Sequence, residues 1–171
     1  MLQLLADRYH ISVSQQVRSP DEDRPAGVYG EYQDGTQTVR LLMPLTMMNE
    51  AGEVLKAMSV NLADLLLVCD DVNLPLGALR LRPQGSAGGH HGLESCLSVL
   101  GTEQVARLRI GVGAAQLPRD LREYVLSPVS ESERPIFQQA LEQAADACQT
   151  WVTEGLDMAM NRYNSAQDVT P

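Results

Sequence analysis

Several kinds of residue are scarce in this sequence, and each scarcity excludes a class of protein. Lys56 is the only lysine and the formal net charge is -9, so the chain lacks the broad cationic surface needed to coat nucleic acid non-specifically. Only three cysteines occur, Cys69, Cys96 and Cys148, and their odd number and wide spacing argue against a disulfide framework or a CxxC metal site. The longest apolar runs, such as residues 65–69, are too short to cross a bilayer. We therefore expect a cytoplasmic protein without a membrane anchor.

Predicted helices and strands alternate along the chain. With 171 residues, 44% of them apolar, the chain suffices for one well-buried domain and hardly for two, so residues 1–171 are expected to form a single domain. Periodicity and capping signals predict helices at residues 2–9, 49–58, 93–100 and 130–151, and strands at 28–33, 37–43, 65–69, 78–82 and 107–112. This alternation predicts an α/β fold with three α/β/α layers and a central mixed, mostly parallel sheet, in which the apolar run 65–69 is a central buried strand.

Two stretches place polar groups next to these elements. Asp70 and Asp71 directly follow the apolar run at 65–69, and an acid there can orient a histidine, bind a metal or simply end the strand at the surface. Asn49 precedes a predicted helix, where its side chain can cap the helix or hold a substrate through its amide. The residues alone leave these alternatives open.

A third stretch, QGSAGGHHGL at residues 84–93, combines four glycines with His90 and His91. Its glycines permit positive φ angles and leave amide N–H groups free for an anion or a carbonyl oxygen. It matches neither the P-loop nor the dinucleotide-binding pattern. The two histidines can serve as bases or metal ligands, but no third ligand occurs at a sensible spacing, so no metal site is expected.

Four motifs follow one another in a specific order: MNEAG, DDVNLPLG, RLRPQGSAGGHHGL and RLRIGVG. In this order they resemble the bacterial-type peptidyl-tRNA hydrolase (aminoacyl-tRNA hydrolase) family, and the resemblance covers nearly the whole chain. It implies a metal-independent carboxylic ester hydrolase without a cofactor, which cleaves the ester between peptide and tRNA and so recycles the tRNA. The implied partners are peptidyl-tRNA or tRNA, the implied base is a histidine acting on water, and we expect a monomer.

The resemblance also assigns roles by position. Asp70 matches the aspartate that orients the histidine, and Arg80 and Arg82 fall where basic residues approach the tRNA phosphates. The substrate side is assigned to Asn49, to His91, which stands where the family has a second asparagine, and to the neighbouring residues Met47, Gly88, Gly89 and His90.

Three departures from the family pattern bear on activity. The family's N-terminal strand and catalytic-histidine segment have no counterpart in residues 1–171, and His10 falls after the first helix, where the family has no catalytic role. Met47 replaces an aromatic residue, and His91 replaces an asparagine, exchanging an amide for an imidazole. We therefore expect impaired hydrolysis. We also expect an opened sheet that costs stability or favours association, because the family's first strand lies inside the sheet.

Several interpretations remain open. Met1 is either an internal methionine of a longer product or the start of a degenerate paralogue, and we favour the paralogue. The alternative function is a non-catalytic tRNA- or RNA-binding paralogue of the same fold. In a third interpretation His91 replaces the missing base beside Asp70, and in a fourth the chain is an α/β domain unrelated to tRNA.

Overall fold

The computed structural model describes residues 1–18 and 24–164, whose contacts divide into two compact units. Unit 1 comprises Met1, Val68–Arg82 and the chain from Arg107 onward, and unit 2 comprises Leu2–Leu67 and Pro83–Ala106. Each unit has a three-stranded sheet. That residues 1–171 form a single domain stays a prediction.

Unit 2 is built on an antiparallel sheet of strands in the order β1-β2-β3. Its elements are α1 (Leu2–Arg8), β1 (Gln15–Arg18), β2 (Pro25–Asp34), β3 (Gln37–Pro44), the short 3-10 helices η1 (Met48–Glu50) and η2 (Leu62–Asp64), α2 (Glu53–Lys56) and α3 (His91–Leu100). The predicted hairpin is confirmed: Asp34 pairs with Gln37, and Gly35 between them has a φ of 59°, which glycine adopts without strain.

The core of unit 2 lies between this sheet and its helices. Val54 and Leu55 of α2 pack with Val17 and Ala26 of the strands and with Cys96 of α3, all buried. A Cβ on Gly27 would lie 2.6 Å from a side-chain carbon of Val54. The missing side chain therefore lets α2 approach β2 closely.

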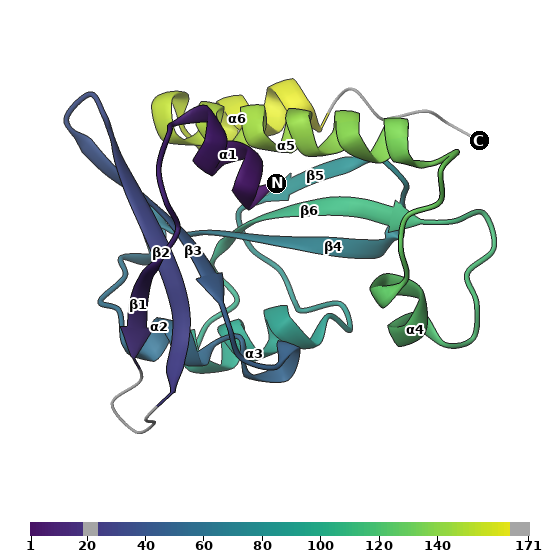
Figure 1. The fold of residues 1–171 in the computed structure, drawn as a ribbon, viewed down its shortest axis with the longest axis horizontal. Coiled ribbons are helices and arrows are strands. Elements are labelled where there is room, and N and C mark those ends of the chain that lie inside the picture. Colours follow the sequence, from purple (N-terminus) through teal and green to yellow (C-terminus); the bar gives the residue numbers. More distant parts are fainter. Residues whose placement is uncertain (19–23, 165–171) are drawn as a thin grey trace. The chain divides into compact units, whose positions relative to one another are not determined.

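Unit 1 carries a mixed sheet in the order β4-β6-β5. Its elements are β4 (Leu66–Pro75), β5 (Leu79–Arg82), β6 (Ala106–Gly113), α4 (Leu121–Leu126), α5 (Arg134–Glu154) and α6 (Leu156–Tyr163). β5 and β6 are antiparallel, whereas Figure 1 shows β4 and β6 running in the same direction. α6 packs against β5 and α5 packs against α6, with both helices on one side of the sheet (Figure 1).

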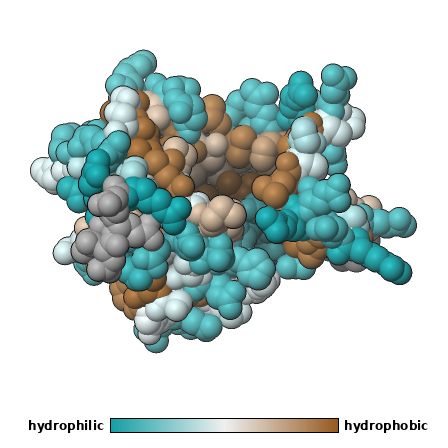
Figure 2. Space-filling view, turned by 60° about the horizontal axis from the view of Figure 1, so that its bottom comes forward, coloured by the Kyte–Doolittle hydropathy of each residue, from teal (hydrophilic) through white to brown (hydrophobic). Residues whose placement is uncertain are grey.

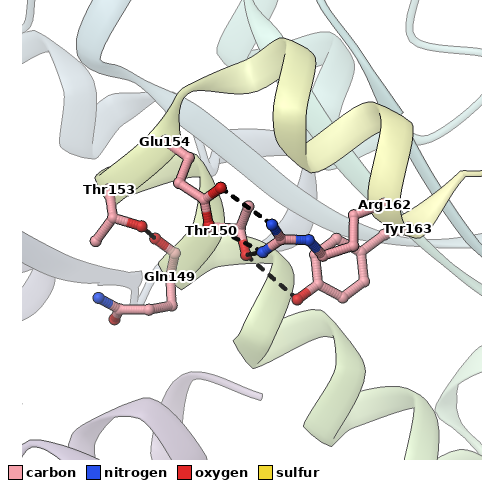
Figure 3. A network of polar contacts seen from close by, with 6 residues as sticks. All are labelled: Gln149, Thr150, Thr153, Glu154, Arg162 and Tyr163. Atoms are coloured by element: carbon pink, nitrogen blue, oxygen red, sulfur yellow. Dashed lines mark hydrogen bonds and ion pairs between the residues drawn. The ribbon is translucent and has the colours of Figure 1, made fainter.

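The turn between α5 and α6 is fixed by a polar network near Gly155, where the chain has a φ of 89°. Arg162 donates to both carboxylate oxygens of Glu154, at 2.9 and 3.0 Å, and to Thr150 at 3.3 Å (Figure 3). Beyond it, Asn164 accepts from the backbone N–H of Leu81 at 2.7 Å and donates to its carbonyl at 2.9 Å. This side-chain amide therefore occupies both outward backbone groups of Leu81 on the edge strand β5.

The structure confirms the α/β class, the mixed sheet and most elements, and it corrects three details. Parallel pairing does not dominate, since the pairs β1–β2, β2–β3 and β5–β6 are all antiparallel. β4 lies at one end of its strand order, and most of its side chains are half-buried or exposed, so it is not the central buried strand expected from its apolar run. The helix predicted at 49–58 is reduced to η1 and the four-residue α2. The three-layer arrangement stays a prediction.

Candidate functional site

The candidate site in unit 2 is a groove of about 590 Å³ between the η1–α2 segment and α3. Its lining residues come from both sides: Asn49, Glu53, Lys56, His91, Glu94, Ser95, Ser98 and Val99. Of the predicted substrate-binding residues, the structure brings Asn49 and His91 together here. The other residues assigned to the substrate side, Met47, Gly88, Gly89 and His90, are not among those that line it.

The two adjacent histidines have different surroundings because α3 begins between them. His90 is the N-cap residue, and its Nδ1 accepts the backbone N–H of Leu93 at 3.0 Å, which places the proton of the neutral ring on Nε2. His91 is the first helical residue, and its exposed ring has Nδ1 3.4 Å from a carboxylate oxygen of Glu94. Gly88 and Gly89, with φ angles of 59° and 84°, form the turn that leads into this cap.

Asn49 is held near α3 by close backbone packing. The backbone N–H of Gly52 donates to Ser95 Oγ at 3.0 Å, and a Cβ on Gly52 would lie 2.4 Å from the Ser95 carbonyl oxygen. A Cβ on Gly92 would likewise lie 2.5 Å from Met48 Sδ. Because its contact is with main-chain atoms, Gly52 sets the spacing between η1–α2 and α3, and with it the spacing between Asn49 and His91.

The idea that Asn49 caps a helix is wrong. Met47 precedes η1 as its N-cap and Gly52 precedes α2, and neither cap is closed by a side-chain hydrogen bond. Asn49 itself lies within η1 and is exposed. Its amide is therefore not used as a helix cap and lines the groove instead.

Large apolar side chains are exposed along the segment of the chain that leads into η1. Met47 and Met48, which precede Asn49, are 60% and 56% exposed, and Met43 and Leu45 are also exposed. Figure 2 shows apolar side chains among hydrophilic ones on one face of the molecule. Flexible thioether side chains adapt to partners of different shape.

Four arginines share one face of the β5–β6 ladder in unit 1. Arg80 lies opposite Arg109, and Arg82 lies opposite Arg107. Residues directly opposite each other in an antiparallel pair, and residues two apart in a strand, point to the same face. The alternate residues Leu79, Leu81, Leu108 and Ile110 are buried and point to the other face.

These arginines differ in how much of their charge is available. Arg107 is 1% exposed, and Arg109 Nε lies 3.1 Å from Oδ2 of the buried Asp71. Neither atom has an aligned hydrogen bond, so the attraction is that of an ion pair. Within the described part of the chain no carboxylate pairs with the half-buried Arg80 or the exposed Arg82. The free positive charge of this face therefore resides on Arg80 and Arg82.

Asp70 lies half-buried on β4 and points to the opposite face from Asp71, because neighbouring residues of a strand alternate. Asp70 belongs to unit 1 and Asn49 and His91 to unit 2, so the grouping of all three in one cleft stays a prediction. Next to Asp70 in the sequence, burial of the Cys69 thiol and, to a lesser degree, the Asp70 carboxylate together raise the pKa of the thiol to about 12. Cys69 is thus a neutral thiol near pH 7 and no thiolate nucleophile.

Sequence reasoning named Asp71 but missed its pairing with Arg109, and it missed Ser95 altogether. The signal for the Asp71–Arg109 pair was present, because Arg-x-Arg in both RLRPQ and RLRIG places arginines on one face of paired strands. Nothing in the sequence marked Ser95 as the acceptor for Gly52. In residues 1–18 and 24–164, no three His, Cys, Asp or Glu residues converge on a metal position, and no helix there has the length and apolarity to cross a membrane.

Comparison with known proteins gives one consistent family. A family model described as peptidyl-tRNA hydrolase matches residues 1–170. The peptidyl-tRNA hydrolase of Syntrophomonas wolfei is 36% identical over 168 residues, covering 96% of this chain and 87% of the relative, and that of Bacillus cereus strain Q1 is 36% identical over 165 residues, covering 94% and 85%. The crystal structure of peptidyl-tRNA hydrolase from Acinetobacter baumannii matches with a TM-score of 0.82 and 26% identity, covering 96% of this chain and 82% of that chain. The chain therefore belongs to the peptidyl-tRNA hydrolase family.

Proposed function

We propose that this chain binds peptidyl-tRNA and assists hydrolysis of the ester between the peptide and the tRNA. The observation that carries the proposal is the family match over residues 1–170. Two surfaces of suitable chemistry support it: the groove with Asn49 and His91, and the arginine face with Arg80 and Arg82.

Each surface has a role that follows from its chemistry. Arg80 and Arg82 attract tRNA phosphates, because guanidinium groups bind phosphate through charge-assisted hydrogen bonds. Asn49 and His91 hold the ester or the adjoining peptide bond through amide and imidazole hydrogen bonds, which steady the developing oxyanion. Met47, Gly88, Gly89 and His90 support the same side, through apolar contact and through the turn that sets the start of α3.

Asp70 is proposed to orient and stabilise a protonated histidine during catalysis. Residues 1–171 contain only His10, His90 and His91, and His90 already uses Nδ1 as a helix cap. General-base assistance is typically worth about 10²–10⁴ in rate. We therefore propose that the chain of residues 1–171 hydrolyses peptidyl-tRNA slowly, with His91 as the base candidate to test first.

The test is release of the peptide from N-acetylated peptidyl-tRNA by residues 1–171, compared with Asp70→Asn, His91→Asn and the exposed control Asp157→Asn. Loss of the rate in Asp70→Asn but not in the control supports the proposal. An unchanged rate of hydrolysis in Asp70→Asn would refute the proposed role of the Asp70 carboxylate.

A non-catalytic tRNA-binding paralogue is the second candidate, and it is favoured by the substitutions at Met47 and His91 on the substrate side. Such a paralogue would bind tRNA through the arginine face and would not hydrolyse the ester. Binding of tRNA without hydrolysis, unchanged when the chain carries an added N-terminal segment with the family's histidine, supports this candidate over the first.

A further inference from the structure

The groove continues past Asn49 and His91 along α2 and α3, and its charged residues are of both signs. Lys56 Nζ lies 2.7 Å from a carboxylate oxygen of Glu53, so these two charges largely cancel. Glu94 lies on the other wall, 68% exposed at its side chain, and its neighbour is His91 at 3.4 Å. The carboxylates of Glu53 and Glu94 and the ammonium group of Lys56 together give the groove about one net negative charge.

This charge suits one part of the proposed substrate better than the other. An RNA strand brings a phosphate charge with every nucleotide, and a surface of net negative charge repels it. The arginine face on β5 and β6 has the opposite sign. The peptide part of the substrate has no obligatory negative charge once its carboxyl end is esterified, so it suffers no such repulsion in the groove.

The uncharged lining residues match the polar groups of an extended peptide. Asn49 offers an amide that both donates and accepts. Ser95 Oγ accepts the Gly52 N–H and keeps its own hydrogen for donation, and Ser98 offers an exposed hydroxyl next to the half-buried Val99. A peptide main chain presents alternating donors and acceptors with side chains between them, which this mixture of hydroxyl, amide and apolar groups can satisfy.

The walls of the groove are held in place without a ligand. Gly52 permits a contact with the main chain of Ser95 that a Cβ would prevent, and the Gly52–Ser95 hydrogen bond joins the two walls. A preformed groove loses less conformational freedom on binding than one that must order itself.

We propose that the groove between α2 and α3 binds the peptide part of the substrate and selects against acidic side chains through Glu94. The identity of the peptide as part of a substrate rests on the proposed function, whereas the charge preference rests on the groove alone. Basic and neutral peptides are bound, and peptides with an acidic residue are repelled by the carboxylate that Lys56 leaves uncompensated.

The test is an NMR titration of uniformly ¹⁵N-labelled chain 1–171 with two N-acetylated tripeptide amides that differ only in a central lysine or glutamate. The lysine peptide should shift the amide signals of Glu94, Ser95 and Ser98, which line the groove. One exposed ion contact is worth about threefold in affinity, so reversing the peptide charge should give about a tenfold preference for lysine. In Glu94→Gln the preference should be lost, since the remaining carboxylate of Glu53 is paired with Lys56.

The matched control is Glu103→Gln, which removes an exposed carboxylate of unit 2 that does not line the groove, and it should keep the preference. A dispersed amide spectrum checks that each variant is folded. Equal affinity for both peptides, signals that shift only outside the groove, or no shift up to about 5 mM peptide would overturn the proposal.

The trinucleotide cytidine-cytidine-adenosine, a probe for the RNA part, separates this proposal from the alternative that RNA occupies the groove. Shifts of Ser95 and Ser98 by the trinucleotide but not by the lysine peptide overturn the peptide assignment. Failure of tRNA binding together with retained peptide selectivity refutes the proposed function and leaves the groove assignment standing.

Discussion

Removing the two free arginines of unit 1 tests the assignment of the tRNA surface. Arg80 and Arg82 carry the charge of this face that no carboxylate compensates in the described chain, whereas Arg109 is paired with Asp71 and Arg107 is buried. Arg80→Ala with Arg82→Ala should therefore remove most of the phosphate attraction of the face. The ion pair between Asp71 and Arg109 should remain intact.

The size of the effect follows from counterion release. Each phosphate neutralised by an arginine contributes about 0.7–0.9 to the slope of log affinity against log salt concentration. Two contacts then lower the slope by about 1.4–1.8 and, near 0.15 M salt, weaken tRNA binding by about 15–30-fold. Substituting Arg109 as well should add instability, because Asp71 would be left buried and unpaired.

The measurement is fluorescence anisotropy of labelled tRNA across a series of salt concentrations, for the wild-type chain and the double variant. The charge-matched control is Arg18→Ala with Arg40→Ala, two exposed arginines on β1 and β3 of unit 2. A double variant at positions 80 and 82 with an unchanged slope, or a control with the same loss, would refute the assignment.

Three further predictions concern stability and reactivity. Asn164→Leu should lower the free energy of unfolding by about 2–4 kcal/mol in urea titrations, because it leaves the N–H and C=O of Leu81 unpaired in a partly buried position. Gly52→Ala should cost about 1–3 kcal/mol or more, since its Cβ meets the main chain of Ser95. Burial raises the pKa of the Cys148 thiol from 9.0 to about 12, so its alkylation at pH 8 should be slow until the chain is unfolded. Its contribution to stability should be constant below pH 9 and should decline as the pH rises toward 12, because only the unfolded thiol ionises in that range.

The fold was predictable where local patterns act alone. Alternation of apolar and polar residues around Asp34-Gly35 specified the hairpin, and α1 and α3 follow from helical spacing. The prediction for β4 was wrong because a continuous apolar run such as 65–69 is typical of a strand buried on both faces. In the structure β4 lies at one end of the strand order, and its Val68 is exposed. The position of a strand within a sheet depends on its pairing with strands far away in the sequence, and a short stretch of sequence does not show that pairing.

The sequence named Asn49 and His91, which both line the groove, but it did not predict the local geometry. The helix expected at Asn49 is nearly absent, and its place is taken by η1 and a short α2. Gly52 explains the difference, because a close contact with Ser95 from a distant segment decides the backbone there. Likewise, the sequence does not distinguish the two adjacent histidines. They differ only because α3 begins between them, so that His90 caps the helix and His91 is exposed.

The division between a positive and a negative surface follows from the period of each element. Strand alternation in β5 and β6 gathers Arg80, Arg82, Arg107 and Arg109 on one face, although the chain as a whole carries a net charge of -9. On α3, by contrast, the ten residues from His91 to Leu100 contain Glu94 and no lysine or arginine. An acidic protein can thus carry a positively charged surface and a negatively charged groove at once. The residue spacing places its free arginines on β5 and β6 and places none on α3.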